Sequence, residues 1–185
     1  MNILGLSGSL RAASINSMLL RATVRLAPKD INVSIFNRLG ELPLFNPDLE
    51  ASLPANVVNF HRAVADADAL LFASPEYAHG VTGTIKNALD WLVGFEPFAC
   101  KFVAVLNASP RAHHADDALR ETLRTMAAVI VEPASISIPL LGVDLDESAM
   151  VATPSIAGAI RESLRAMRNA VASRQGSFTA EFPIR

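Results

Sequence analysis

Short runs of apolar, β-branched residues alternate along the chain with longer segments of helical periodicity. Each run is too short for a helix and is bounded by Gly, Pro, Ser or Asn, which is typical of buried strands. The expected strands are Asn2–Leu6, Ile31–Phe36, Ala69–Ala73, Phe102–Leu106 and Ile130–Ile138. The expected helices are Asn16–Ala27, Ala55–Ala67, Thr84–Val93, Ala115–Ala128 and Pro154–Ser173.

This alternation predicts the fold class. Strands that are apolar on both faces and separated by helices indicate a parallel sheet covered on both sides, with right-handed crossovers. We therefore expect one α/β domain over residues 1–185, a doubly wound three-layer sandwich with a five-stranded parallel sheet. The segments Arg38–Pro54 and Leu140–Thr153 lack periodicity and are expected at the surface, and the tail 174–185 is expected to be partly mobile.

Composition narrows the environment and the partners. A chain of 185 residues, of which 51% are hydrophobic, is long enough to bury one hydrophobic core. The net charge of −2 gives no general attraction to nucleic acid or to an anionic membrane, and no stretch reaches the length of a membrane span. Cys100 is the only cysteine, so no internal disulfide can form. A lone thiol is typical of a reducing compartment, and we expect the protein to be cytoplasmic.

The first loop, GLSGSLRAASIN from Gly5 to Asn16, follows the first strand and precedes the first helix. In such sheets ligands bind beyond the carboxyl ends of the strands, and a helix N-terminus favours an anion. The loop lacks the glycine triplet of dinucleotide sites, but it has hydroxyls and Arg11, which suit a terminal phosphate. From this loop alone, simple helix capping with a solvated Arg11 is an equally good interpretation.

The loop after the third strand makes the assignment specific. It reads SPEYAHGVTGTIKNALDWL from Ser74 to Leu92 and holds the only tyrosine of the chain. Together with GSLRAASIN it resembles the NADPH-dependent FMN reductase family of flavodoxin-like flavoproteins, which includes quinone reductases. The family pattern is approximately G-S-x-R-x-x-S-x-N followed by P-E-Y-N-x-S-x-x-G-x-x-K-N-A-x-D-W.

The resemblance implies a set of flavin-binding residues. The phosphate would be surrounded by Ser9, Arg11, Ser14, Asn16 and Ser17, and the ribityl chain and ring by Pro75, Glu76, Tyr77, Ala78, His79 and Gly80. Ala78 and Gly80 replace the Asn and Ser that are common in the family, so only backbone contacts are expected there. The loop after the fourth strand, NASPRAHHAD, matches less well. By its position we expect Asn107, Ala108, Ser109 and Arg111 to face the flavin.

The resemblance also implies an activity. NADPH or NADH would pass a hydride to N5 of bound FMN and leave, and a quinone or similar small oxidant would then be reduced at the same site by ping-pong exchange. No catalytic side chain is required, because the cofactor carries the chemistry. The alternative is a flavodoxin-type electron carrier that binds FMN without turning over NAD(P)H. Such carriers enclose the ring between aromatic residues, and this chain has one tyrosine and a charged phosphate loop.

For four further residues, the neighbouring sequence does not define a single role. His113 and His114 are adjacent and lack companions at metal-ligand spacing, so we expect a surface loop and no metal. For His79 a packing or polar-contact role is preferred to proton donation. Glu76 is expected to bind backbone N–H groups of its own loop.

The segment Thr84–Val93 predicts assembly into a homodimer or homotetramer. Ile85, Leu89, Leu92 and Val93 share one helical stripe that should face the sheet, which turns Trp91 outward. With the phenylalanines at 95 and 98 it would form an apolar patch suited to a second subunit. The competing interpretation is that the following loop covers Trp91 within one chain.

Overall fold

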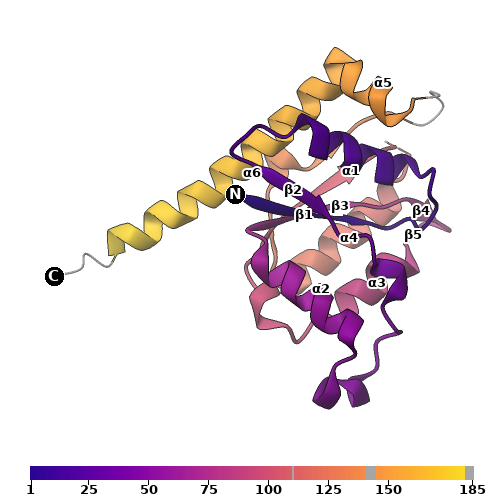
Figure 1. The fold of residues 1–185 in the computed structure, drawn as a ribbon, viewed down its shortest axis with the longest axis vertical. Helices are drawn as coiled ribbons and strands as arrows, with labels where there is room; N and C mark the ends of the chain where they lie inside the picture. The colour runs from indigo at the N-terminus through magenta and orange to yellow at the C-terminus, as the bar shows by residue number, and fades with distance from the viewer. Residues whose placement is uncertain (110, 141–144, 182–185) are drawn as a thin grey trace.

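The central sheet of the chain is parallel and has the strand order of a doubly wound fold. The computed structural model describes residues 1–109, 111–140 and 145–181. The strands β1 to β3 and β6 to β7 pair in the order β2-β1-β3-β6-β7, and the order reverses between β1 and β3 (Figure 1). Their bounds are β1 Asn2–Ser7, β2 Asn32–Ile35, β3 Ala69–Ala73, β6 Phe102–Asn107 and β7 Val129–Ile130.

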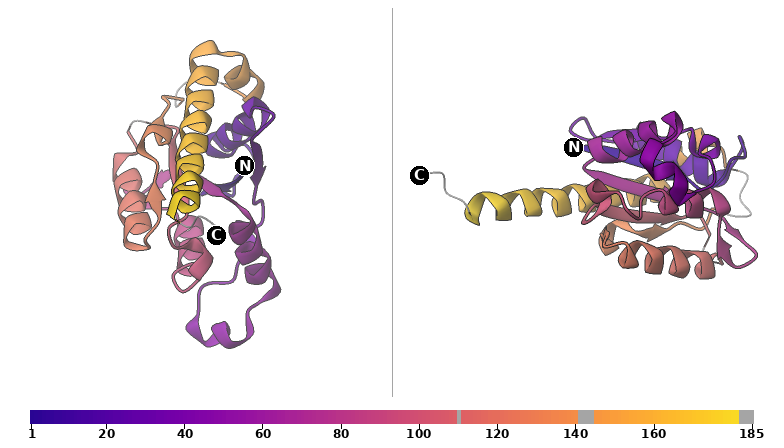
Figure 2. Two further views of the ribbon diagram at one scale, coloured as in Figure 1. Left: turned by 90° about the vertical axis from the view of Figure 1, so that its left-hand side faces the viewer. Right: turned by 90° about the horizontal axis from the view of Figure 1, so that it is seen from below.

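Helices cover both faces of this sheet, which confirms the three-layer prediction (Figure 2). On one face α1 (Ile15–Leu26), α5 (Glu147–Ala152) and α6 (Pro154–Glu181) share a core with the sheet residues Leu71 and Leu106. On the other face α2 (Ala55–Asp66), α3 (Gly83–Asp90) and α4 (His113–Thr125) pack against Leu70 and Phe72. Side chains of β3 alternate between the two cores, as the pleat of a strand requires.

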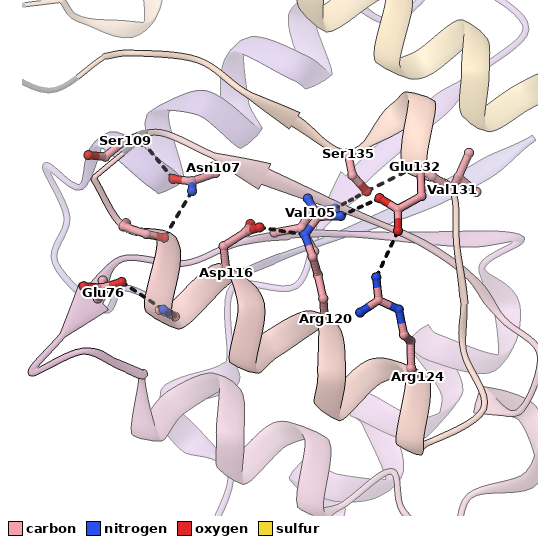
Figure 3. Close-up of polar contacts among 12 residues, drawn as sticks. Glu76, Val105, Asn107, Ser109, Asp116, Arg120, Arg124, Val131, Glu132 and Ser135 are labelled. Atoms are coloured by element: carbon pink, nitrogen blue, oxygen red, sulfur yellow. Dashed lines mark hydrogen bonds and ion pairs between the residues drawn. The ribbon is translucent and has the colours of Figure 1, made fainter.

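The expected fifth strand, Ile130–Ile138, is interrupted. Its two ends are the short strands β7 and β8 (Ile136–Ser137), which both pair with β6, and the 3-10 turn η4 (Glu132–Ala134) separates them. Pro133 lies in this turn and has no N–H to donate to a ladder. Between the two short strands, the Val105 N–H of β6 donates to the hydroxyl of Ser135 at 3.1 Å and not to a strand carbonyl (Figure 3). The prediction of one continuous strand was therefore wrong.

Two helical segments differ from the sequence prediction. The region expected to be irregular, Leu140–Thr153, contains α5, and α6 continues past the predicted end at Ser173 to Glu181. The last part of α6 extends beyond the sheet (Figures 1 and 2). Residues 182–185 of the predicted tail lie outside the described residues. Within the described residues, no helix is both long and apolar enough to cross a bilayer.

Trp91 does not face outward as predicted. Its side chain is 3% exposed, and its Nε1 donates to the Pro43 carbonyl at 2.8 Å. The ring also packs edge-on against Phe45, with centroids 5.0 Å apart. Pro43 and Phe45, which contact the ring, belong to the excursion that holds the 3-10 turns η1 (Leu39–Glu41) and η2 (Pro47–Ser52).

The rest of the expected apolar patch is also largely enclosed within the chain. Phe98, in the 3-10 turn η3 (Glu96–Phe98), is buried, and the Phe95 ring stacks on His61 with centroids 4.0 Å apart. Val93, expected to face the core, is 68% exposed. The described residues therefore give no support to a subunit contact through Trp91.

Candidate functional site

Three loops meet at the carboxyl edge of the sheet, beside the point where the strand order reverses. They enclose a cavity of about 360 Å³. This is the position at which open α/β sheets bind ligands. The residues that line the cavity come from the start of α1, the segment after β3 and the segment after β6: Ile15, Asn16, Ser74, Pro75, Glu76, Tyr77, Asn107, Ala108, Ser109, Arg111 and Ala112.

The first loop is held tightly against the segment after β3. The Gly8 N–H donates to the Ala73 carbonyl at 2.8 Å. A Cβ at Gly8 would lie 2.1 Å from Oγ of Ser74 and 2.9 Å from Oγ1 of Thr82. Gly8 is therefore required because two backbone segments approach each other here, and any side chain would separate the loops that form the cavity.

We expect Gly8→Ala to lower the free energy of unfolding by about 1–3 kcal/mol, the usual effect of overpacking, and to weaken FMN binding. Gly83→Ala is the matched control, because a Cβ at Gly83 meets no atom within 4 Å. That variant should keep native stability and affinity. Urea unfolding and FMN titration measure both quantities. Equal behaviour of the two variants would contradict the close approach at Gly8.

The first turn of α1 holds a buried polar atom that has no hydrogen-bond partner among the described residues. Ser14 is the N-cap residue, yet its side chain makes no capping hydrogen bond. Asn16 is 4% exposed and lines the cavity, and its Oδ1 is buried without a hydrogen-bond partner among the described residues. A buried polar atom without a partner is costly, so it indicates a site for a ligand or a bound water. Capping alone does not account for these residues.

A second cavity, of about 250 Å³, lies on the β2 side of the first loop. Three of the predicted phosphate residues, Ser9, Arg11 and Ser17, line this second cavity and not the first. The hydroxyls of Ser7 and Ser17 lie 2.7 Å apart. Among the described residues the Arg11 guanidinium has no ion-pair partner. The first loop thus separates two cavities, and the predicted phosphate residues divide between them, with Ser14 lining neither.

The segment after β3 forms a hairpin that the sequence did not reveal. Its strands are β4 (Glu76–Tyr77) and β5 (Gly80–Val81), and the turn residues Ala78 and His79 have φ angles of 49° and 59°. Two consecutive positive φ angles are the signature of a type I′ turn. The strand β4 lines the cavity, whereas Ala78, His79 and Gly80 do not.

Glu76 joins the hairpin to helix α4. Its Oε2 accepts the Ala115 N–H at 2.8 Å (Figure 3). The N-cap residue of α4, Ala112, has no side-chain oxygen, so Glu76 satisfies one of the free N–H groups of the helix. The prediction that Glu76 binds N–H groups of its own loop was wrong, because the bonded N–H lies 39 residues further along the chain.

Asn107 shapes the third loop. Its Oδ1 accepts the Ser109 N–H at 2.8 Å, and its Nδ2 donates to the Ala112 carbonyl at 3.2 Å (Figure 3). Helix α4 is fixed further along by Arg120, whose guanidinium lies 2.6 Å from Asp116 and 2.8 Å from Glu132. These bonds hold two walls of the cavity in place before any ligand binds.

The two adjacent histidines do not lie in a loop. His113 and His114 form the first turn of α4, two residues before the predicted start of that helix. Among the described residues, no three His, Cys, Asp or Glu side chains are arranged to hold a metal ion. Cys100 is exposed, and its backbone has a φ angle of 58°.

Sequence reasoning missed three residues of the cavity. Ser74 is the last residue before the family motif, and its position at the end of β3 was an available signal. Ile15 and Ala112 contribute apolar surface only, and no pattern in the sequence distinguishes them from core residues.

Comparison with known proteins identifies the family. A model of the NADPH-dependent FMN reductase family matches residues 1–140. An NAD(P)H-dependent FMN reductase of Pseudomonas aeruginosa is 41% identical over 110 residues, which cover 58% of this chain and 59% of that protein. A quinone reductase of Pseudomonas putida is 38% identical over 125 residues, 63% of this chain and 66% of the relative. The matches thus span about three fifths to two thirds of these relatives.

A solved structure supports the same fold. The flavoenzyme NAD(P)H:(acceptor) oxidoreductase FerB from Paracoccus denitrificans superimposes with a TM-score of 0.74 at 23% identity, over 91% of this chain and 97% of that chain. The strand order, the cavity at the reversal point and the family model agree. The chain belongs to the NADPH-dependent FMN reductase family.

Proposed function

We propose that this chain is an FMN-dependent NAD(P)H oxidoreductase that reduces quinones or similar small oxidants. The observation that carries the proposal is the 360 Å³ cavity at the strand-order reversal, with the unpartnered Oδ1 of Asn16 in its wall. The names of the relatives, an FMN reductase and a quinone reductase, support the same activity.

The residues of the first loop fit the phosphate of FMN. The phosphate carries up to two negative charges, and Arg11 offers a guanidinium without an ion-pair partner among the described residues. Ser9, Ser14 and Ser17 add hydroxyl groups beside the free N–H groups that begin α1. Asn16 reaches the larger cavity from the same helical turn.

The other two loops fit the ribityl chain and the ring. Pro75, Glu76 and Tyr77 from one side and Asn107, Ala108 and Ser109 from the other line the cavity with mostly apolar surface. Ala78, His79 and Gly80 lie outside that lining, so in this conformation they support the wall through the turn and do not contribute side chains to it.

When bound, FMN supplies the hydride and electron chemistry. The residues of the chain bind it, exclude water from one face and stabilise negative charge. Backbone N–H groups and the Arg111 guanidinium are the donors near the cavity for such charge. Arg111 also suits a phosphate of NADPH or NADH, because its guanidinium is unpaired within the described part of the chain.

An anaerobic spectrum tests the function. Purified protein, supplied with FMN, should be yellow and should bleach when NADPH or NADH is added, then regain colour with a quinone. A yellow protein that neither nicotinamide cofactor bleaches would identify an electron carrier. A colourless protein that ignores added FMN would contradict both functions.

We also propose a cytoplasmic homodimer or homotetramer. The unpaired, exposed Cys100 fits a reducing compartment. Leu44 and Val93 are 83% and 68% exposed and belong to the segments around Trp91, which gives this region apolar surface for a second copy. Light scattering should report at least a dimer, and Leu44→Asp with Val93→Asp should reduce assembly, whereas Val24→Asp on α1 should not. A native monomer would refute the proposal.

A further inference from the structure

Two stacked histidine rings, with a third tilted ring next to them, connect the β4–β5 hairpin to α4. The His79 and His114 rings are nearly parallel, with an interplanar angle of 15° and centroids 4.3 Å apart. The His113 ring lies 4.0 Å from His114 on the same helical turn. His79 belongs to the turn of the β4–β5 hairpin, and the other two begin α4, so the stack joins two elements that are distant in the sequence.

Both joined elements are walls of the cavity. Glu76 and Tyr77 of the hairpin line it, and so do Arg111 and Ala112, the residues just before α4. The hairpin is attached to α4 by the stack and by the bond from the Ala115 N–H to Glu76. A change in the separation of hairpin and helix would therefore change the shape of the cavity.

We propose that His79 and His114 are positioning residues for the flavin, which hold the hairpin against α4 as long as the two imidazoles are not both charged. The proposal rests on the proposed FMN site. Neutral rings attract each other when stacked, whereas two imidazolium ions at this distance repel. Acidification that charges both rings would then open one wall of the cavity.

The other charged groups on these elements do not remove this repulsion. Glu76 is engaged by the Ala115 N–H, and Asp116 pairs with Arg120. Arg111 and the positive end of α4 add to the repulsion. Asp117 lies one helical turn from His113 and His114, so its carboxylate offsets only part of the repulsion.

The test compares the native chain with His114→Phe, which retains a stackable ring without a titratable nitrogen. Two charges 4.3 Å apart in water correspond to about a five-fold change in an equilibrium constant. Between pH 7.5 and 5.5 the Kd for FMN should rise about five-fold more for the native chain than for His114→Phe. The FMN phosphate itself titrates near pH ~6, and its contribution to the pH dependence of the Kd is the same for both proteins.

Two further variants define the outcome. His114→Ala should bind FMN about two- to ten-fold more weakly than native at pH 7.5, the usual worth of a ring pair, with the pH dependence of His114→Phe. His61→Asn is the control, because the His61 ring stacks on Phe95 and bonds to the Trp91 carbonyl, away from the cavity. Equal pH dependence of native and His114→Phe, or loss of the dependence in His61→Asn, would overturn the proposal.

A measurement without flavin separates this proposal from the proposed function. The Ala115 amide reports the contact between the hairpin and α4 through its bond to Glu76. In the flavin-free chain its hydrogen-exchange protection should fall between pH 7.5 and 5.5 in the native protein and not in His114→Phe. Failure of FMN binding at pH 7.5 would contradict the function, whereas unchanged Ala115 protection would contradict the clamp.

Discussion

A chain in which Ser9 and Arg11 are both alanine should bind FMN at least about 100-fold more weakly than the native chain. Hydrogen bonds to a charged group contribute about 1.5–3 kcal/mol each, and both side chains line the cavity in which we propose that the phosphate binds. The Arg11 guanidinium has no ion-pair partner in the described part of the chain, so its removal leaves no charge unpaired. Titration of the flavin-free protein with FMN measures the effect.

Riboflavin and a second variant serve as controls for this result. Riboflavin lacks the phosphate, so its affinity should be the same for the native and double-variant chains. Arg62→Ala removes an exposed guanidinium on α2 and should leave FMN affinity unchanged. An equal loss for riboflavin and FMN would show that the first loop acts on the ring or on folding. Native FMN affinity would mean that the phosphate binds elsewhere.

Trp91→Ala should lower the free energy of unfolding by about 3–5 kcal/mol, the usual range for a buried aromatic residue. The side chain is 3% exposed, and its removal leaves a cavity beside Phe45. Trp91→Phe retains most of the apolar volume and loses only the hydrogen bond to Pro43. Its free energy of unfolding should therefore fall by about 1 kcal/mol. Denaturant unfolding followed by circular dichroism checks both, because the variants lack the only tryptophan.

The matched control for Trp91 is Val24→Ala. Val24 is 39% exposed on α1, outside the proposed subunit contact, and its truncation should change stability by no more than about 0.5 kcal/mol. If Trp91→Ala were equally mild and instead abolished assembly, Trp91 would contribute to an interface, and the enclosed position described above would be wrong.

Local patterns predicted the elements of the fold closely. The strand Ala69–Ala73 has the predicted bounds, and α1 and α2 each begin and end within one residue of prediction. These elements have strong periodicity, so their sequence alone defines them. The six-residue α5 is too short to show a periodic stripe, and it was missed. In the predicted fifth strand, the apolar run indicated one continuous strand, although Pro133 interrupts it.

Long-range contacts explain the errors at the site. The bond from Trp91 to Pro43 spans 48 residues, and a helical wheel cannot show that a distant segment covers one face. The bond from Ala115 to Glu76 spans 39 residues for the same reason. Topology did predict which loops meet, because parallel strands end at one edge of the sheet. It could not predict that the first loop separates two cavities, since side-chain packing decides that.

The interrupted strand beside β6 also limits how copies of this chain can join. A long exposed edge strand presents a row of free N–H and C=O groups on which another chain can add a strand, the first step of fibrous aggregation. Here β7 and β8 have two residues each, and the turn between them places Pro133 and the charged Glu132 at that edge. This edge therefore offers only short, interrupted ladders for another copy to pair with, which disfavours strand-to-strand aggregation on this side.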